Sequence, residues 1–73
     1  MTISAAQSRA ARGLLNWTQK QLAEASGASL GTVVDFEREK RVPMRANREA
    51  LQRAFETAGI EFIENGVRLR QST

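Results

Sequence analysis

The sequence has no cysteine and no histidine among its 73 residues. Their absence excludes disulfide bridges, thiolate and imidazole nucleophiles, and the zinc sites that those side chains build. Only Asp and Glu remain for acid–base chemistry, and so short a chain has little room for a substrate pocket. We therefore expect a protein that is not an enzyme and that holds no cofactor and no metal.

Long apolar runs are missing as well. No stretch approaches the roughly 18 apolar residues of a membrane span, and the N-terminus lacks the charged and apolar regions of a signal peptide. We therefore expect a cytoplasmic protein with no membrane partner. A domain of this size buries only about 60% of the surface that its unfolded chain exposes, which favours a homodimer that buries more.

Negative charge is scarce in two segments of the chain. The 11 Lys and Arg residues outnumber the 8 Asp and Glu residues, for a formal net charge of +3. Residues 1–23 hold three basic and no acidic side chains, and residues 38–53 hold six basic and two acidic ones. Such segments suit a phosphate backbone, although solvated helix faces explain the charge equally well.

Capping signals predict where two helices begin. Ser4 with Gln7, and Thr18 with Gln21, each have the capping-box pattern, in which hydroxyl and amide side chains satisfy free backbone donors. The first helix is expected to weaken near Gly13, and the second to run to about residue 25. On the first helix the apolar spacing predicts one buried stripe, which contains Ala6, Ala10 and Leu14.

Two further helices are predicted from glycine, serine and proline signals. Gly27 supplies a left-handed residue that stops the second helix, and Ser29 is a suitable N-cap for a third. Because the residue before Pro43 is disfavoured in a helix, residues 38–44 are expected to form a loop. Asn47 then caps a fourth helix, which Gly59 ends.

The period of the apolar residues changes from 3.6 to 2 after Gly59, which predicts two strands. Asn65-Gly66 is the strongest short signal for a hairpin turn. If those two residues form the turn, Phe62 faces Leu69 across the strands. One face of the hairpin is then apolar and the other charged.

An isolated hairpin is barely stable in water, so something must cover its apolar face. Joining two hairpins across a two-fold axis would pair one free edge and bury both apolar faces. We therefore expect residues 60–71 to be a dimerisation element, and the alternative is a lid folded back on its own domain. The predicted interface residues are Ile60, Phe62, Val67 and Leu69.

Residues 18–38 have the outline of a helix-turn-helix, in which two short helices are joined by a tight turn with glycine. Leu22 is the apolar anchor of the first helix, and Ala23 is the small residue that allows a close crossing. Gly27 makes the turn. Val33 lies beneath the second helix, so the outer, N-terminal side of that helix is free to enter a major groove.

The wider segment 7–58 resembles the helix-turn-helix domain of the Cro and phage-repressor class, also called the xenobiotic-response-element class. The matching stretches are Arg12 to Gln19, Leu22 to Glu24, Gly27 to Ser29 and Phe36-Glu37. Residues 58–70 also resemble a strand-bearing extension in a bacterial branch of these small regulators. The resemblance implies a mainly α fold: a lambda-repressor-like DNA-binding domain of four or five helices over residues 1–59, with a short C-terminal β-hairpin.

The resemblance also implies roles for individual positions. An ion pair between Arg12 and Glu37 would join the first helix to the end of the recognition helix, and Gln19 would bind a phosphate and brace that helix. The implied base-reading set is Ser29, Leu30, Gly31, Thr32 and Asp35. The implied phosphate-binding set is Thr18, Gln19, Lys20, Arg38, Lys40, Arg41 and Arg45.

These base readers are chemically weak. Gly31 has no side chain, and Leu30 can contact only a thymine methyl, whereas good readers present an amide or guanidinium to purine edges. Asp35 could accept from cytosine N4, but phosphates repel it. We therefore expect much of the affinity to come from backbone contacts and part of the sequence choice to come from DNA shape.

The sequence thus favours a bacterial or phage-type transcriptional regulator at the nucleoid, which binds double-stranded DNA as a homodimer at a palindromic operator and represses. With no room for a ligand domain, its regulation would come from its concentration or from a partner protein. The weak base readers keep a second hypothesis open, a protein-binding module such as an antitoxin or antiactivator.

Overall fold

The computed structural model describes residues 2–70, and it has four helices followed by one hairpin. The elements are α1 (Ala5–Leu15), α2 (Gln19–Ser26), α3 (Leu30–Glu37), α4 (Arg45–Thr57), β1 (Ile60–Ile63) and β2 (Gly66–Leu69). The predicted mainly α fold with a C-terminal hairpin is confirmed. Residues 1 and 71, the outer ends of the two predicted segments, lie outside the described residues.

Local capping explains why the first three helices begin and end where they do. Both predicted capping boxes are present, and Gln7 N lies 3.1 Å from Ser4 Oγ while Gln21 N lies 3.0 Å from Thr18 Oγ1. The Ser29 hydroxyl caps α3. These contacts satisfy backbone donors that a helix start leaves free, so the starts are confirmed as local properties of the sequence.

The predicted buried stripe on α1 is wrong. Ala6 and Ala10 are exposed, and Leu14 is 44% exposed. The face that α1 buries instead includes Ser8 and Ala11, both 0% exposed. Small side chains on this face let α1 pack closely against the rest of the domain, and the Ser8 hydroxyl bonds to a carboxylate of α3. A tertiary hydrogen bond therefore outweighs the apolar spacing.

The start of α4 also differs from the prediction. The helix begins at Arg45 after Met44, which makes no side-chain cap, and Asn47 is the third helical residue rather than the cap. Pro43 interrupts the backbone just before this point, and the helix starts as soon as that constraint ends. The side chain of Asn47 is therefore not needed to begin the helix.

The hairpin register is shifted by two residues from the prediction. Phe62 pairs with Val67 and Ile60 with Leu69, because the loop consists of Glu64 and Asn65. Asn65 adopts the left-handed backbone with φ of 60°, so it is the second loop residue, not the first. A shift of two keeps every side chain on its expected face, so the apolar face survives the error.

The apolar face of the hairpin is covered by its own domain, not by a second hairpin. Ile60 is 1% exposed, and Phe62 and Val67 pack against the core, where the ring centroids of Phe62 and Phe55 lie 5.9 Å apart. Gln7 Nε2 on α1 donates to two backbone carbonyls of the hairpin, at 2.8 and 3.1 Å. Leu69, 46% exposed, is the partial exception.

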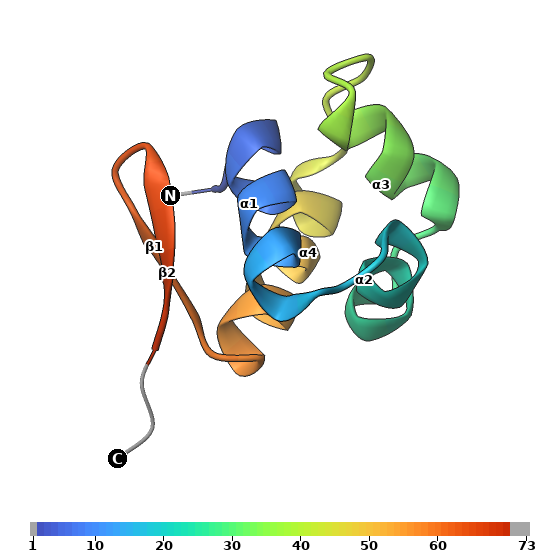
Figure 1. Ribbon diagram of the computed structural model, residues 1–73. Coiled ribbons are helices and arrows are strands. Elements are labelled where there is room, and N and C mark those ends of the chain that lie inside the picture. Colours follow the sequence, from blue (N-terminus) through green and yellow to red (C-terminus); the bar gives the residue numbers. More distant parts are fainter. Residues whose placement is uncertain (1, 71–73) are drawn as a thin grey trace.

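Figure 1 shows the resulting arrangement, with the hairpin beside α1 on one side of the molecule and α3 on the other. The core between them is built on Leu22, Val33, Leu51 and Phe55, each 0% exposed. The ring of Trp17 stacks on Phe55 with centroids 5.8 Å apart. Within residues 2–70, no helix is long and apolar enough to cross a membrane.

Candidate nucleic-acid interface

The helices α2 and α3 are joined by the short turn of residues 27–29. Gly27 makes the turn with φ of 82°, a left-handed backbone that most other residues adopt only with strain. Ala23, 7% exposed, lies at the crossing, and Val33 on the inner side of α3 is fully buried. This geometry presents the outer side of α3 to solvent, as a helix-turn-helix does.

The outer side of α3 holds all five implied base-reading residues. Leu30 is 47% exposed. Ser29 and Gly31 are exposed, while Thr32 and Asp35 are partly buried. A Cβ added to Gly31 would meet only open space, so packing does not require glycine there. The lack of a side chain at this position leaves the backbone of α3 open to close approach.

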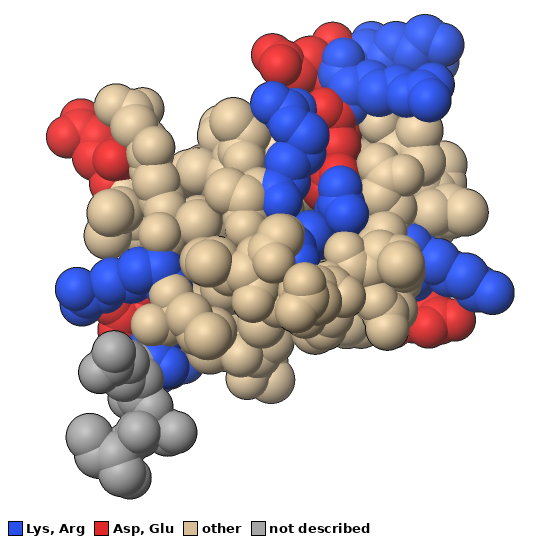
Figure 2. Space-filling model, viewed as in Figure 1, with Lys and Arg blue, Asp and Glu red and all other residues tan. Residues whose placement is uncertain are grey.

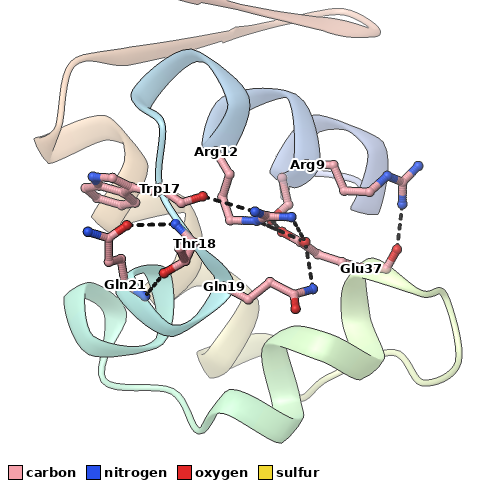
Figure 3. A network of polar contacts seen from close by, with 8 residues as sticks. Arg9, Arg12, Trp17, Thr18, Gln19, Gln21 and Glu37 are labelled. Carbon is pink, nitrogen blue, oxygen red and sulfur yellow. Dashed lines mark hydrogen bonds and ion pairs between the residues drawn. The ribbon is translucent and has the colours of Figure 1, made fainter.

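The carboxylate of Glu37, at the end of α3, is the centre of a buried polar network (Figure 3). Arg12 Nη2 lies 2.6 Å from Glu37 Oε1, and Arg12 Nε donates to both carboxylate oxygens. Ser8 Oγ donates to Oε2 at 2.5 Å, and Gln19 Nε2 donates to Oε1 at 3.2 Å. Donors from α1 and α2 thus converge on one residue of α3.

Charge and burial act against each other in this network. Burial raises the pKa of Glu37, but the hydrogen bonds from Arg12, Ser8 and Gln19 together lower it by more, so its pKa lies below the ordinary value of 4.5. The hydrogen bond to Glu37 in turn raises the pKa of Arg12. Both side chains are therefore charged over the whole neutral range, and the pair holds α3 against α1.

Two further contacts extend the network beyond the ion pair. Arg12 Nη1 donates to the backbone carbonyl of Trp17 at 3.0 Å, which ties α3 to the segment that leads into α2. Arg9 Nη1 donates to the backbone carbonyl of Glu37 at 2.5 Å. Arg9 is a member of the network that was not expected from the sequence. Its spacing of three residues before Arg12, which puts both on one face of α1, is the signal that could have found it.

The implied phosphate-binding residues lie on both flanks of α3. Thr18, Gln19 and Lys20 stand at the start of α2. Gln19 is partly buried by its bond to Glu37, so it braces α3 as the resemblance implies. Figure 2 shows basic side chains gathered around the connection between α3 and α4. The exposed basic residues of that connection and of the start of α4 are Arg38, Lys40, Arg41 and Arg45.

One of these cations is already paired. Arg45 Nε lies 3.2 Å from Glu49 Oε2 on the exposed surface of α4. An exposed pair of this kind is worth little, on the order of 0.3–0.5 kcal/mol, so a phosphate can compete for the arginine. Acidic neighbours such as Glu39 lie among the basic residues, so the positive field is concentrated at a few side chains rather than spread evenly.

The comparisons with known proteins agree with this geometry. The profile of the family described as Helix-turn-helix matches residues 9–62, from α1 to the first strand, which is well over half of the chain. No curated protein matches the sequence. With the turn at Gly27 and the open outer side of α3, the match shows that the chain belongs to the helix-turn-helix family of the Cro and phage-repressor class, whose members are DNA-binding regulators.

Proposed function

We propose that the protein is a transcriptional repressor that binds a palindromic operator as a homodimer. The outer side of α3 carries this proposal, because it is open to solvent and has basic residues on both flanks. An α-helix presented in this way fits the major groove of B-DNA. Binding within a promoter then excludes the transcription machinery, which is repression by occupancy and needs no ligand domain.

Phosphate contacts fix the protein on the duplex. Lys20 and the free backbone N–H groups of the first turn of α2 face the phosphates on one flank. Arg38, Lys40 and Arg41 face the phosphates on the other. The network around Glu37 keeps the two flanks at a constant separation, since it ties α1, the start of α2 and the end of α3 together.

Base contacts come from the outer side of α3. Leu30 contacts a thymine methyl, and Ser29, Thr32 and Asp35 offer polar groups to the base edges. The hydroxyls of Ser29 and Thr32 already bond to each other at 2.9 Å, so DNA must share or replace that bond. Gly31 lets the helix approach the groove closely, and the shape of the DNA supplies the rest of the preference.

The homodimer forms through the exposed part of the hairpin. Ile63 and Leu69 are 49% and 46% exposed, and a two-stranded sheet has two free edges that a second copy can pair. Because the hairpin and α3 lie on opposite sides of the molecule (Figure 1), this contact leaves α3 free. It also places the two α3 helices far apart, so we expect half-site centres two helical turns apart rather than one.

Footprinting of the DNA upstream of the protein's own gene tests the proposal. We expect a protected inverted repeat whose affinity falls about a thousandfold or more between 50 and 200 mM salt, as for about four phosphates per subunit. Arg41→Ala should weaken binding. The matched control is Arg68→Ala, which removes an arginine of the hairpin that is paired with Glu61 at 2.6 Å, and it should leave binding unchanged. The absence of any protected repeat at low salt contradicts the proposal.

The second candidate function is a protein-binding module, such as an antitoxin or antiactivator. The exposed Leu30 beside Gly31 favours it, since this pair offers an apolar surface rather than hydrogen bonds to bases. Footprinting separates the candidates. A protein-binding module gives no protected repeat, whereas a repressor gives one in the absence of any other protein.

A further inference from the structure

A concavity of about 240 Å³ lies beside the outer side of α3, and it contains residues that the sequence alone does not connect with DNA. We call it the α3–α4 pocket. Its floor and walls come from α3, from the connection that follows α3, and from the first turn of α4. The lining residues are Thr32, Asp35, Arg41, Val42, Pro43, Met44 and Asn47.

Asn47 is the residue of this pocket without a structural role. The sequence suggests that it caps α4, yet that helix begins two residues earlier and has no side-chain cap. Its side chain is only partly buried and makes no hydrogen bond within residues 2–70. A half-exposed amide that neither caps nor packs is free to bond to a molecule that enters the pocket.

The position of Asn47 places its amide beside implied base readers. Thr32 and Asp35 of α3 line the same pocket, so a base edge that reaches either of them also comes near Asn47. An asparagine amide donates and accepts at once, which matches N6 and N7 of adenine in the major groove. Asn47 therefore supplies the bidentate polar group that Leu30 and Gly31 lack.

The chemistry of the pocket fits a base better than a phosphate. The carboxylate of Asp35 repels a phosphate placed beside it, but it can accept from the amino group of a cytosine. Val42, Pro43 and Met44 add an apolar wall that suits a sugar or a thymine methyl. Arg41 at the rim offers a counter-charge for the neighbouring backbone phosphate.

We propose, on the basis of the operator binding proposed above, that Asn47 is a specificity-determining residue that reads one base pair of each half-site from the α3–α4 pocket, with adenine as the preferred partner. The reading surface then comprises two elements, the outer side of α3 and the first turn of α4. Sequence preference arises at a position that the recognition helix by itself does not specify.

Selection from a library of randomised duplexes tests this inference with the full-length protein. The variant is Asn47→Ala, which removes the amide at a helical position where alanine is well tolerated. The matched control is Gln52→Ala on the same helix, because the amide of Gln52 bonds to Glu56 at 3.1 Å and does not line the pocket. Thermal unfolding of all three proteins verifies that they remain folded.

We expect the wild type and Gln52→Ala to enrich the same motif. Asn47→Ala should enrich that motif with one position per half-site randomised, and should bind the best wild-type site about five- to a hundredfold more weakly. Its affinity for a scrambled duplex and its salt dependence should stay unchanged.

Two results overturn the inference while operator binding stands. One is an unchanged motif and affinity for Asn47→Ala. The other is a uniform loss of affinity for all duplexes with a smaller salt slope, which identifies a phosphate contact instead. If the wild type enriches no motif, the proposed function is refuted together with this inference.

Discussion

Removal of Arg12 is the most informative perturbation of the fold, because it leaves a buried carboxylate without its main partner. The side chain of Arg12 is 20% exposed and that of Glu37 is 2% exposed. In Arg12→Met the carboxylate keeps only the donors of Ser8 and Gln19. Breaking a buried pair by removing one partner costs about 3–5 kcal/mol, and the partial exposure of Arg12 places the loss near 3 kcal/mol.

A loss of about 3 kcal/mol is large for a chain of 73 residues. Each kcal/mol lowers the melting temperature of such a domain by about 4–8 °C, so we expect a decrease of about 12–24 °C. Urea unfolding followed by the fluorescence of Trp17, which stacks on Phe55 in the core, measures the free energy of unfolding directly. The measurement is best made near 10 °C, where the variant retains a folded population.

A double-mutant cycle shows whether the loss comes from the unpaired charge. Glu37→Gln removes the charge and keeps the shape of the side chain, so Arg12→Met in that background should cost only about 1 kcal/mol. The coupling between the two positions is then about 2 kcal/mol. An equal cost of Arg12→Met in both backgrounds would refute the reasoning, since the arginine would then act through packing alone.

Three further predictions concern pH, DNA and assembly. Because the pKa of Glu37 is lower in the folded than in the unfolded chain, its stabilisation is complete above about pH 4.5 and is lost as the pH falls below that value, and acid unfolding of the wild type and of Glu37→Gln should show this difference. Leu30→Ala should relax the preference for one thymine, whereas Arg41→Ala and Arg45→Ala should weaken binding to all duplexes and lower the salt slope by about one for each phosphate that the variant no longer binds; base-preference changes in Arg45→Ala but not in Leu30→Ala would invert these roles. Leu69→Lys should weaken the dimer in sedimentation experiments without unfolding the protein, and an unchanged dimer would move the interface away from the hairpin; truncation after residue 58 is unsuitable because it removes the buried Ile60 from the core.

Much of the fold is predictable because its signals are local. The capping boxes at Ser4 and Thr18 and the left-handed Gly27 depend on backbone groups within a few residues, and all three are confirmed. The failures involve longer distances. Asn47 has the composition of a cap, but the constraint at Pro43 sets the start of α4, and the position of Asn65 in the loop sets the register of the hairpin.

The candidate site divides in the same way. The spacing of residues 18–38 indicates a helix-turn-helix, and the resemblance pairs Arg12 with Glu37, which the structure joins at 2.6 Å. Neither source indicated that Ser8 and Gln19 share the same carboxylate. The spacing of apolar residues on α1 even favoured the opposite face, because a pattern of apolar residues does not register a buried hydroxyl that has a distant partner.

The sequence by itself therefore determined the helices, the turn between α2 and α3 and the family of the protein, since these depend on local backbone chemistry and on the order of residues along the chain. Only the tertiary structure decided what covers the hairpin, and it brought Asn47 into one pocket with Thr32 and Asp35. The physical reason is that burial and pocket formation depend on which distant surfaces meet. Residues as far apart as Gln7 and Ile63 are joined by a hydrogen bond of 2.8 Å that no short pattern encodes.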